Sequence, residues 1–189
     1  MPSESPADVV RELRKHLNES LAAQFFATEG LQHMRNQLQQ IRPDPSNPNP
    51  KVMLGYGKPV GPNPPHYASL PRSTAVYHLR RNGEVEDRLG QQWIVAFCST
   101  WDEEFRLRLE AAHGCPENAI RVDAFGDLRL MRHDIVHGRG QASLANTGRC
   151  KVLHWFRPPH CIRPSMPQLG ELPDLVPWAA LEQGPWPRP

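Results

Sequence analysis

The side chains best suited to chemistry gather in one stretch, residues 128–140, which reads LRLMRHDIVHGRG. Its ionisable groups include Arg132, His133, Asp134, His137 and Arg139. On a helix, which turns about 100° per residue, His133 and His137 share a face one turn apart. Asp134 comes three residues before His137, so its carboxylate could hold an imidazole N–H and fix the tautomer. This stretch is therefore the candidate active site.

Arg132 stands on a different side of the same predicted helix. It precedes His137 by five residues, so an ideal helix rotates the two side chains about 140° apart. They converge on one target only if the helix unwinds at its end, if the long arginine reaches round, or if a second subunit completes the site. Gly138, directly after His137, favours unwinding.

An arginine and a histidine that meet can cleave RNA without a metal ion. Arginine offers a planar fork for the non-bridging oxygens of a phosphate. Histidine titrates near neutral pH and can both accept and donate a proton. The 2′-hydroxyl of RNA already lies beside the scissile phosphate. A base, a cation and an acid therefore suffice for cleavage to a 2′,3′-cyclic phosphate.

The motif from Arg132 to His137, followed by Gly138-Arg139-Gly140, resembles the signature of the HEPN superfamily (higher eukaryotes and prokaryotes nucleotide-binding). That signature is an Arg, four to six residues and a His, late in an all-helical domain. The polar residue after the Arg is often Asn, and here it is His133. The resemblance implies catalytic roles for Arg132 and His137, with His133 or Asp134 as the polar partner.

The same resemblance implies a small helical bundle, often dimeric, with two Arg/His motifs facing each other across the interface. Many members are metal-independent endoribonucleases of toxin–antitoxin, abortive-infection or CRISPR systems, and others bind RNA or a partner protein without cleaving. Arg139 occupies the position two residues after His137. Silencing of a toxin by modification of a tyrosine at that position is therefore not expected.

Two alternatives remain open. His133-Asp134-Ile135-Val136-His137 is H-D-x-x-H, close to the H-E-x-x-H motif of zinc hydrolases, with His154 or His160 as a third ligand. Asp is shorter than the Glu base of that motif, so the ribonuclease is favoured, and neither a metal nor another cofactor is expected. In the second alternative Arg132 only forms an ion pair with Asp127 or Glu103.

Basic residues near the motif are candidates for an RNA path, namely Arg129, Arg139, Arg149 and Lys151. The formal net charge of +2 excludes a large basic field, so contact with RNA must be local. The expected partners are RNA, a second copy of the chain, and an antitoxin or other protein. The sequence shows no membrane span, no signal peptide and no CxxC spacing among its four cysteines, which favours a cytoplasmic protein.

The periodicity of apolar residues predicts an all-α antiparallel bundle. Helices are expected over residues 6–41, as one helix or two joined near Gly30, and over residues 84–112 and 117–137. Residues 42–72 hold nine prolines and read as a long irregular insertion, followed by a strand or helical turn at 74–79. We expect one domain over residues 1–157 and an irregular, proline-rich tail over 158–189.

Overall fold

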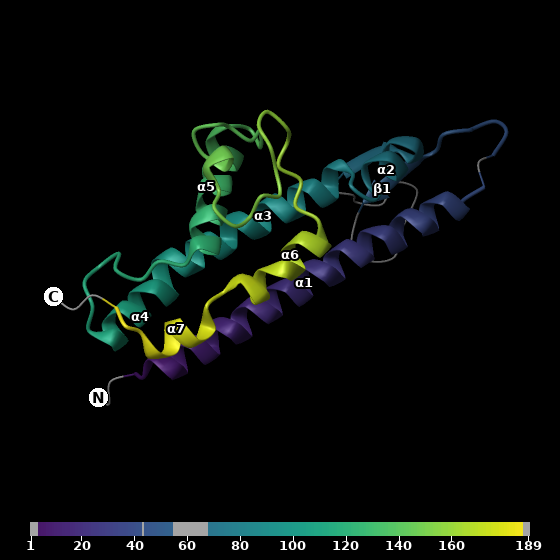
Figure 1. Cartoon of the computed structure of the whole chain (residues 1–189). Helices are drawn as coiled ribbons and strands as arrows, with labels where there is room; N and C mark the ends of the chain where they lie inside the picture. Colours follow the sequence, from purple (N-terminus) through teal and green to yellow (C-terminus); the bar gives the residue numbers. More distant parts are fainter. Residues whose placement is uncertain (1–3, 43, 55–67, 187–189) are drawn as a thin grey trace. The chain divides into compact units, whose positions relative to one another are not determined.

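The apolar periodicity of the chain produces helices in the computed structural model, which describes residues 4–42, 44–54 and 68–186 (Figure 1). Apart from one two-stranded sheet, the regular structure of these residues is helical. The chain divides into two compact units, one formed by residues 1–25 and 87–189 and the other by residues 26–86. Within the described residues, no helix combines the length and the apolar character needed to cross a bilayer.

The first helix, α1, runs from Pro6 to Gln40 without a break at Gly30, so the one-helix form of the prediction is confirmed. Ser5 begins it, because its Oγ accepts a hydrogen bond from the backbone N–H of Asp8 at 3.2 Å. The apolar stripe near its start is buried in the core of the first unit and consists of Val9, Val10, Leu13 and Leu17.

The predicted aromatic helix is present as three consecutive segments that follow one another directly along the chain. These are α3 (Glu84–Thr100), a π-helical turn (Trp101–Phe105) and α4 (Arg106–His113). Its aromatic stripe lies in the core, where the parallel rings of Trp93 and Phe97 are 5.1 Å apart. Gly114 ends α4 in the left-handed conformation, with φ of +61°.

The helix that carries the candidate site, α5, spans Asp123–His137 and not residues 117–137. The expected start at 117 is wrong, because a turn follows Pro116, where the N–H of Ala119 bonds to the Pro116 carbonyl at 3.1 Å. Asn118 then adopts a positive φ of 63°, which a helix does not contain. The buried side of α5 is formed by Ala124, Phe125, Leu128 and Met131.

The C-terminal segment is not the irregular tail that its prolines predicted. It forms α6 (Met166–Leu175) and α7 (Trp178–Gln183). Pro167 stands in the first turn of α6, where a missing N–H is harmless, and the Gln168 side chain accepts the N–H of Ser165 at 3.0 Å. The fully buried leucines of this C-terminal segment belong to the core of the first unit; they are Leu169 and Leu172 on α6 and Leu181 on α7. The edges of the two units therefore do not coincide with the expected boundary after residue 157.

The second unit contains the later part of α1 and the proline-rich insertion. The insertion is not wholly irregular, since β1 (Lys51–Leu54) and β2 (Ala68–Pro71) pair antiparallel with Lys51 opposite Pro71. The helical alternative for residues 74–79 is confirmed by α2 (Arg72–His78). Arg72, the first residue of α2, connects this helix to α1, because its Nε donates a hydrogen bond to the Leu38 carbonyl at 2.6 Å. Part of the insertion, residues 43 and 55–67, lies outside the described residues.

Candidate active site

Two exposed imidazoles lie together at the C-terminal end of α5. The ring centroids of His133 and His137 are 4.8 Å apart, with 52° between the ring planes. Both side chains are solvent-accessible. One turn of helix separates the two residues, which is why the predicted pair forms. A base and an acid for the same reaction could therefore both stand here.

Asp134 is turned away from this pair and into the protein. Only 2% of its surface is exposed. Its carboxylate accepts hydrogen bonds from the backbone and hydroxyl groups of Ser143 at 2.8 Å each, from Asn146 at 2.7 Å, and from the hydroxyl of Thr147 at 2.7 Å. Among the described residues, no hydrogen bond joins Asp134 to His137. The expected contact between them is wrong, because the loop after α5 supplies the carboxylate with donors.

These donors also decide the charge of Asp134. Burial alone would raise its pKa, but the hydrogen bonds from Asn146, Ser143 and Thr147 outweigh burial and hold the pKa far below the usual range. The carboxylate is ionised at any physiological pH. Asp134 is therefore an anchor for residues 143–147 and not a general base.

Asn146 joins the buried carboxylate to the exposed imidazoles, and nothing in the sequence analysis pointed to it. Its Nδ2 donates to Asp134 and lies 2.9 Å from Nδ1 of His133. An ionised carboxylate can only accept, so the group facing Asp134 must be the amide NH₂. The same NH₂ then donates to His133 Nδ1, which leaves the ring proton on Nε2. Asp134 thus positions His133 through Asn146.

Arg132 and His137 project from different sides of α5. α5 remains helical through His137, and the N–H of Gly138 still bonds to the Asp134 carbonyl at 2.8 Å. Of the three ways in which the two side chains could converge, unwinding of the helix end is absent, and the backbone keeps the rotation of about 140° between the two residues.

Arg132 lies on the side of α5 that faces α3. Burial raises the pKa of the Cys98 thiol on α3 to about 12, Asp102 adds to this rise, and the nearby charges of Arg132 and Arg129 oppose it. The Nε of Arg132 is buried without a hydrogen-bond partner in the described part of the chain. A guanidinium with unused donor capacity thus stands beside the histidine pair without touching it.

A second buried carboxylate, Asp127, anchors the next loop. Its oxygens accept the backbone N–H groups of Lys151, Val152 and Leu153 at 2.7–2.9 Å. The suggested ion pair with Arg132 is therefore replaced by bonds to backbone. Asp127 and Asp134 stand seven residues apart, two turns along one side of α5. Their seven-residue spacing beside the apolar stripe of α5 was the available signal that both are anchors.

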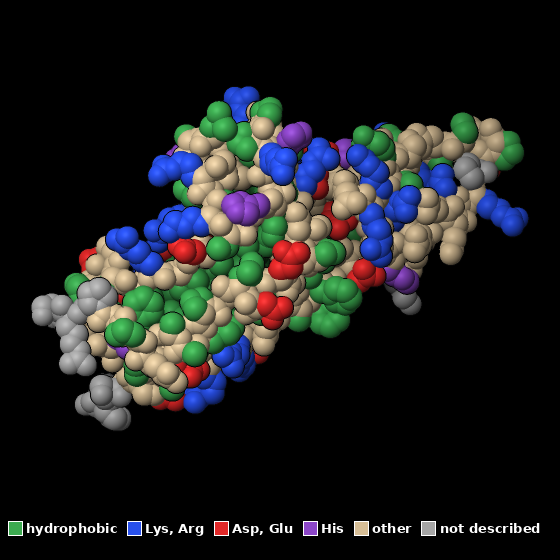
Figure 2. Space-filling model, viewed as in Figure 1, with side chains coloured by type: hydrophobic (Ala, Val, Ile, Leu, Met, Phe, Trp, Pro, Cys, Tyr) green, Lys and Arg blue, Asp and Glu red, His purple; other side chains and the backbone are tan. Residues whose placement is uncertain are grey.

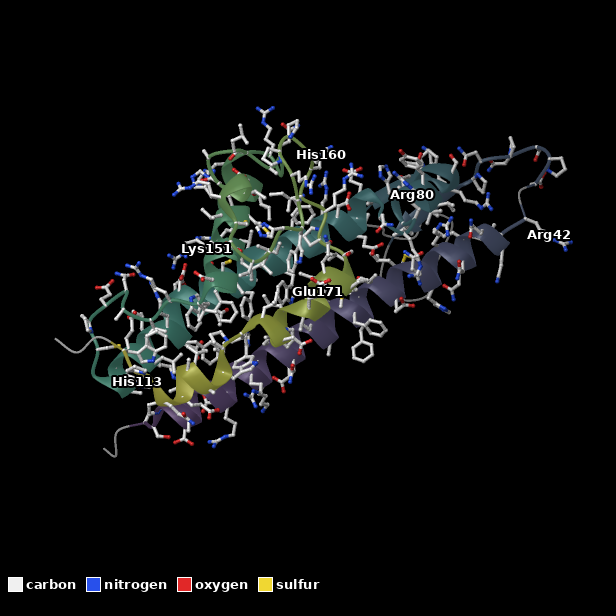
Figure 3. All side chains as sticks on the ribbon, in the orientation of Figure 1. Arg42, Arg80, His113, Lys151, His160 and Glu171 are labelled. Atoms are coloured by element: carbon white, nitrogen blue, oxygen red, sulfur yellow. The ribbon has the colours of Figure 1, made fainter. Side chains whose placement is uncertain are left out.

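The four predicted RNA-binding residues separate into two places. Arg129, Arg149 and Lys151 line one cavity, and Arg139 lines another together with Ile135. Arg129 forms a two-point pair with Asp102, and the Nζ of Lys151, beside α5 in Figure 3, lies 2.7 Å from the Asp123 carboxylate. Figure 2 shows basic side chains interspersed with acidic and apolar ones on the face drawn.

Among the described residues, the zinc alternative has no third ligand. Within residues 4–42, 44–54 and 68–186, no group of three or more His, Cys, Asp or Glu side chains is placed to hold a metal ion. His133 and His137 do share a face, but His154 and His160 do not complete a set with them. The carboxylate of the H-D-x-x-H motif is also bound by the loop donors.

The chain was compared with protein-family models, with curated proteins and with solved structures. None of the three comparisons found a match.

Proposed function

We propose that this protein is a metal-independent endoribonuclease of HEPN type that acts as a dimer. The observation that carries the proposal is the exposed pair of His133 and His137, held at a helix end by the Asp134–Asn146 connection. Arg132, with an unpartnered Nε, is the cation for the reaction. A defence or toxin–antitoxin setting is the biological context we propose, on the strength of the motif.

The reaction needs one proton acceptor and one donor. His137, as the neutral base, removes the proton of the 2′-hydroxyl, and the 2′-oxygen attacks phosphorus. The bond from phosphorus to the 5′-oxygen breaks, and the His137 imidazolium formed in the first step protonates the leaving oxygen, because Nδ1 of His133 accepts from Asn146 and cannot also carry a proton. The products are a 2′,3′-cyclic phosphate and a 5′-hydroxyl. A guanidinium stabilises the charge that develops on the phosphate oxygens.

A second copy of the chain supplies what one copy lacks. Arg132 and His137 project about 140° apart around α5, and Arg132 lies on the side that faces α3, so in this proposal the two contact one phosphate across a dimer. Packing two α5 ends against each other would bring Arg132 of one copy to His137 of the other. The dimer is thus part of the active site, not only an assembly state.

The test is cleavage of single-stranded RNA in EDTA by the wild type and by His137→Ala, Arg132→Ala and His133→Ala. We expect rate losses of about 100-fold or more for His137→Ala and Arg132→Ala. His154→Ala, another exposed histidine outside the pair, is the matched control and should keep wild-type activity. Equal activity of all these proteins would remove the assignment.

A non-catalytic RNA-binding module is the second candidate. It is favoured by the inward orientation of Asp134, which leaves His137 without a carboxylate partner in the described part of the chain. This candidate predicts a folded protein that shifts RNA in a gel, leaves it intact, and loses affinity when Arg149 or Lys151 is replaced. RNA cleavage that depends on His137 would exclude it.

A further inference from the structure

The guanidinium of Arg132 is half-buried and unpaired. Its side chain makes no hydrogen bond or ion pair among the described residues, and its Nε is shielded from solvent. An unsatisfied buried donor is rare, because it has lost its bonds to water and gained none in return. A carboxylate within reach would therefore be expected to pair with Arg132.

Such a carboxylate, that of Asp102, stands one turn away along α5. Arg129 bonds to Asp102, which lies in the π-helical turn after α3. Farther along α5, Ile135 lines a groove together with Val95 of α3. The two helices therefore lie side by side in opposite directions, and Arg132 stands midway between these two contacts. Only three residues, or about 4.5 Å along the helix axis, separate Arg132 from Arg129.

A buried thiol shows that these charges lie close together. Cys98 is one turn before Asp102 and is 2% exposed. Burial is the main reason that the pKa of its thiol is raised, Asp102 adds to the rise, and the charges of Arg132 and Arg129 oppose it. The carboxylate and both guanidinium groups thus surround one buried side chain.

Arg129 keeps the Asp102 carboxylate turned toward itself. Its Nε donates to Oδ2 of Asp102 at 3.1 Å, and its Nη2 donates to Oδ1. This two-point pair fixes the plane of the carboxylate. Arg106 adds only charge, since its Nε lies 4.0 Å from Oδ1, beyond hydrogen-bond distance. Without Arg129, the long side chain of Arg132 can bend back by one turn and take its place.

We propose that Arg129 is a positioning residue, which holds Asp102 and so leaves the Arg132 guanidinium available to a phosphate. An Arg132 paired with Asp102 would have to break that pair before it stabilised charge on a phosphate. The sequence predicts that Arg129 contacts RNA itself, whereas here it acts through Asp102. The effect on cleavage rests on the proposed function, and the pairing of Arg132 does not.

RNA cleavage in EDTA is compared for the wild type, Arg129→Ala, Asp102→Asn and the double variant. We expect Arg129→Ala to lower kcat about tenfold with little change in KM, because Asp102 then captures Arg132. Asp102→Asn and the double variant should stay within about twofold of the wild type, since no carboxylate remains to capture it. The matched control, Arg163→Ala, removes an arginine of similar exposure from its pair with Asp87 and should keep wild-type activity.

Recovery in the double variant is the deciding result. If Arg129 contacted RNA directly, its loss would raise KM and the double variant would stay impaired. If the ion pair only stabilised the fold, Asp102→Asn and the double variant would lose as much activity as Arg129→Ala. Either pattern overturns the proposal, as does full activity of Arg129→Ala.

A second readout needs no RNA. Methylglyoxal modifies guanidinium groups, and mass spectrometry of the digested protein gives the rate of modification at Arg132. We expect this rate to fall about threefold in Arg129→Ala, because an ion pair shields the guanidinium, and to recover in the double variant. Equal rates in all three proteins overturn the proposal. Cleavage that depends on His137 tests the proposed function separately, so a wild type that shows these rates without cleaving RNA contradicts only the nuclease.

Discussion

At the scale of single residues, Asp134 and Asn146 connect the fold to the candidate chemistry. Asp134 is buried and ionised. Asn146 bonds both to the Asp134 carboxylate and to Nδ1 of His133, and so positions His133. Sequence spacing alone suggested a direct bond from Asp134 to His137. That bond is missing because the loop 143–147 brings N–H and hydroxyl donors that a helical projection of residues 128–140 does not include.

Asn146→Ala tests this connection. The change removes the hydrogen bond to His133 but leaves Ser143 and Thr147 on Asp134, so we expect a folded protein whose RNA cleavage falls about tenfold. The matched control is Asn18→Ala, at an exposed position on α1. Cleavage rates and their pH profiles are measured for both variants. An unchanged rate and profile for Asn146→Ala would show that His133 does not need this contact.

Asp134 also makes stability depend on pH. Its pKa is lowered in the folded protein, so its contribution is fully present above the unfolded value, near 3.8, and is lost as pH falls further toward the folded pKa. Asp134→Asn should cost about 2–4 kcal/mol at neutral pH, because buried donors lose a charged acceptor. Urea unfolding at neutral pH and at about pH 3 measures this difference, which should shrink in acid. An equal difference at both pH values would contradict the account.

At the scale of elements, helices with an apolar period were predictable and loops were not. The stripe of Trp93, Phe97, Trp101 and Phe105 gave the position of α3 and α4, and it is core, as that spacing indicated. α5 was expected six residues too early, because its first apolar position, Ile120, is buried from a turn and not from the helix. A buried residue is apolar whether it lies in a helix or in the segment before it, so the apolar pattern does not show where the helix begins.

Proline content misled the prediction for the C-terminal segment. Pro167 starts α6, and Pro173 lies within it. Buried leucines decide the structure of this segment instead, since Leu169, Leu172 and Leu181 have no exposed surface. The alternation of apolar and polar residues over the ten residues of α6 is a short signal, and the nine prolines of residues 158–189 outweighed it in the prediction. The candidate site was also predictable only in part. Local spacing predicted its histidine pair. The contacts of Asp127 and Asn146 join helix α5 to the loops that follow it, and spacing within the helix does not reveal them.

Leu172→Ala and Leu175→Ala on α6 test whether this segment is core. Leu172 is fully buried and Leu175 is 41% exposed. We expect the first to lower the free energy of unfolding by about 2–5 kcal/mol, and the second by about 1 kcal/mol or less. Urea denaturation monitored by tryptophan fluorescence provides both values. Equal, small losses would mean that α6 does not contribute to the core of its unit.

At the scale of the whole molecule, the proposed cleavage reaction requires two copies of the chain. Within one copy, Arg132 lies on the α3 side of α5 and the histidine pair elsewhere on its circumference. Cleavage should therefore be lost in a monomer. Dilution that separates the two copies should abolish RNA cleavage.

Mixing two inactive variants tests the requirement for a shared site most directly. Arg132→Ala and His137→Ala are refolded together in equal amounts and assayed for RNA cleavage in EDTA. If the site takes Arg132 from one copy and His137 from the other, each mixed dimer keeps one intact site, and random pairing restores about a quarter of wild-type activity. A mixture as inactive as each variant alone, beside a wild type that cleaves, would contradict the claim.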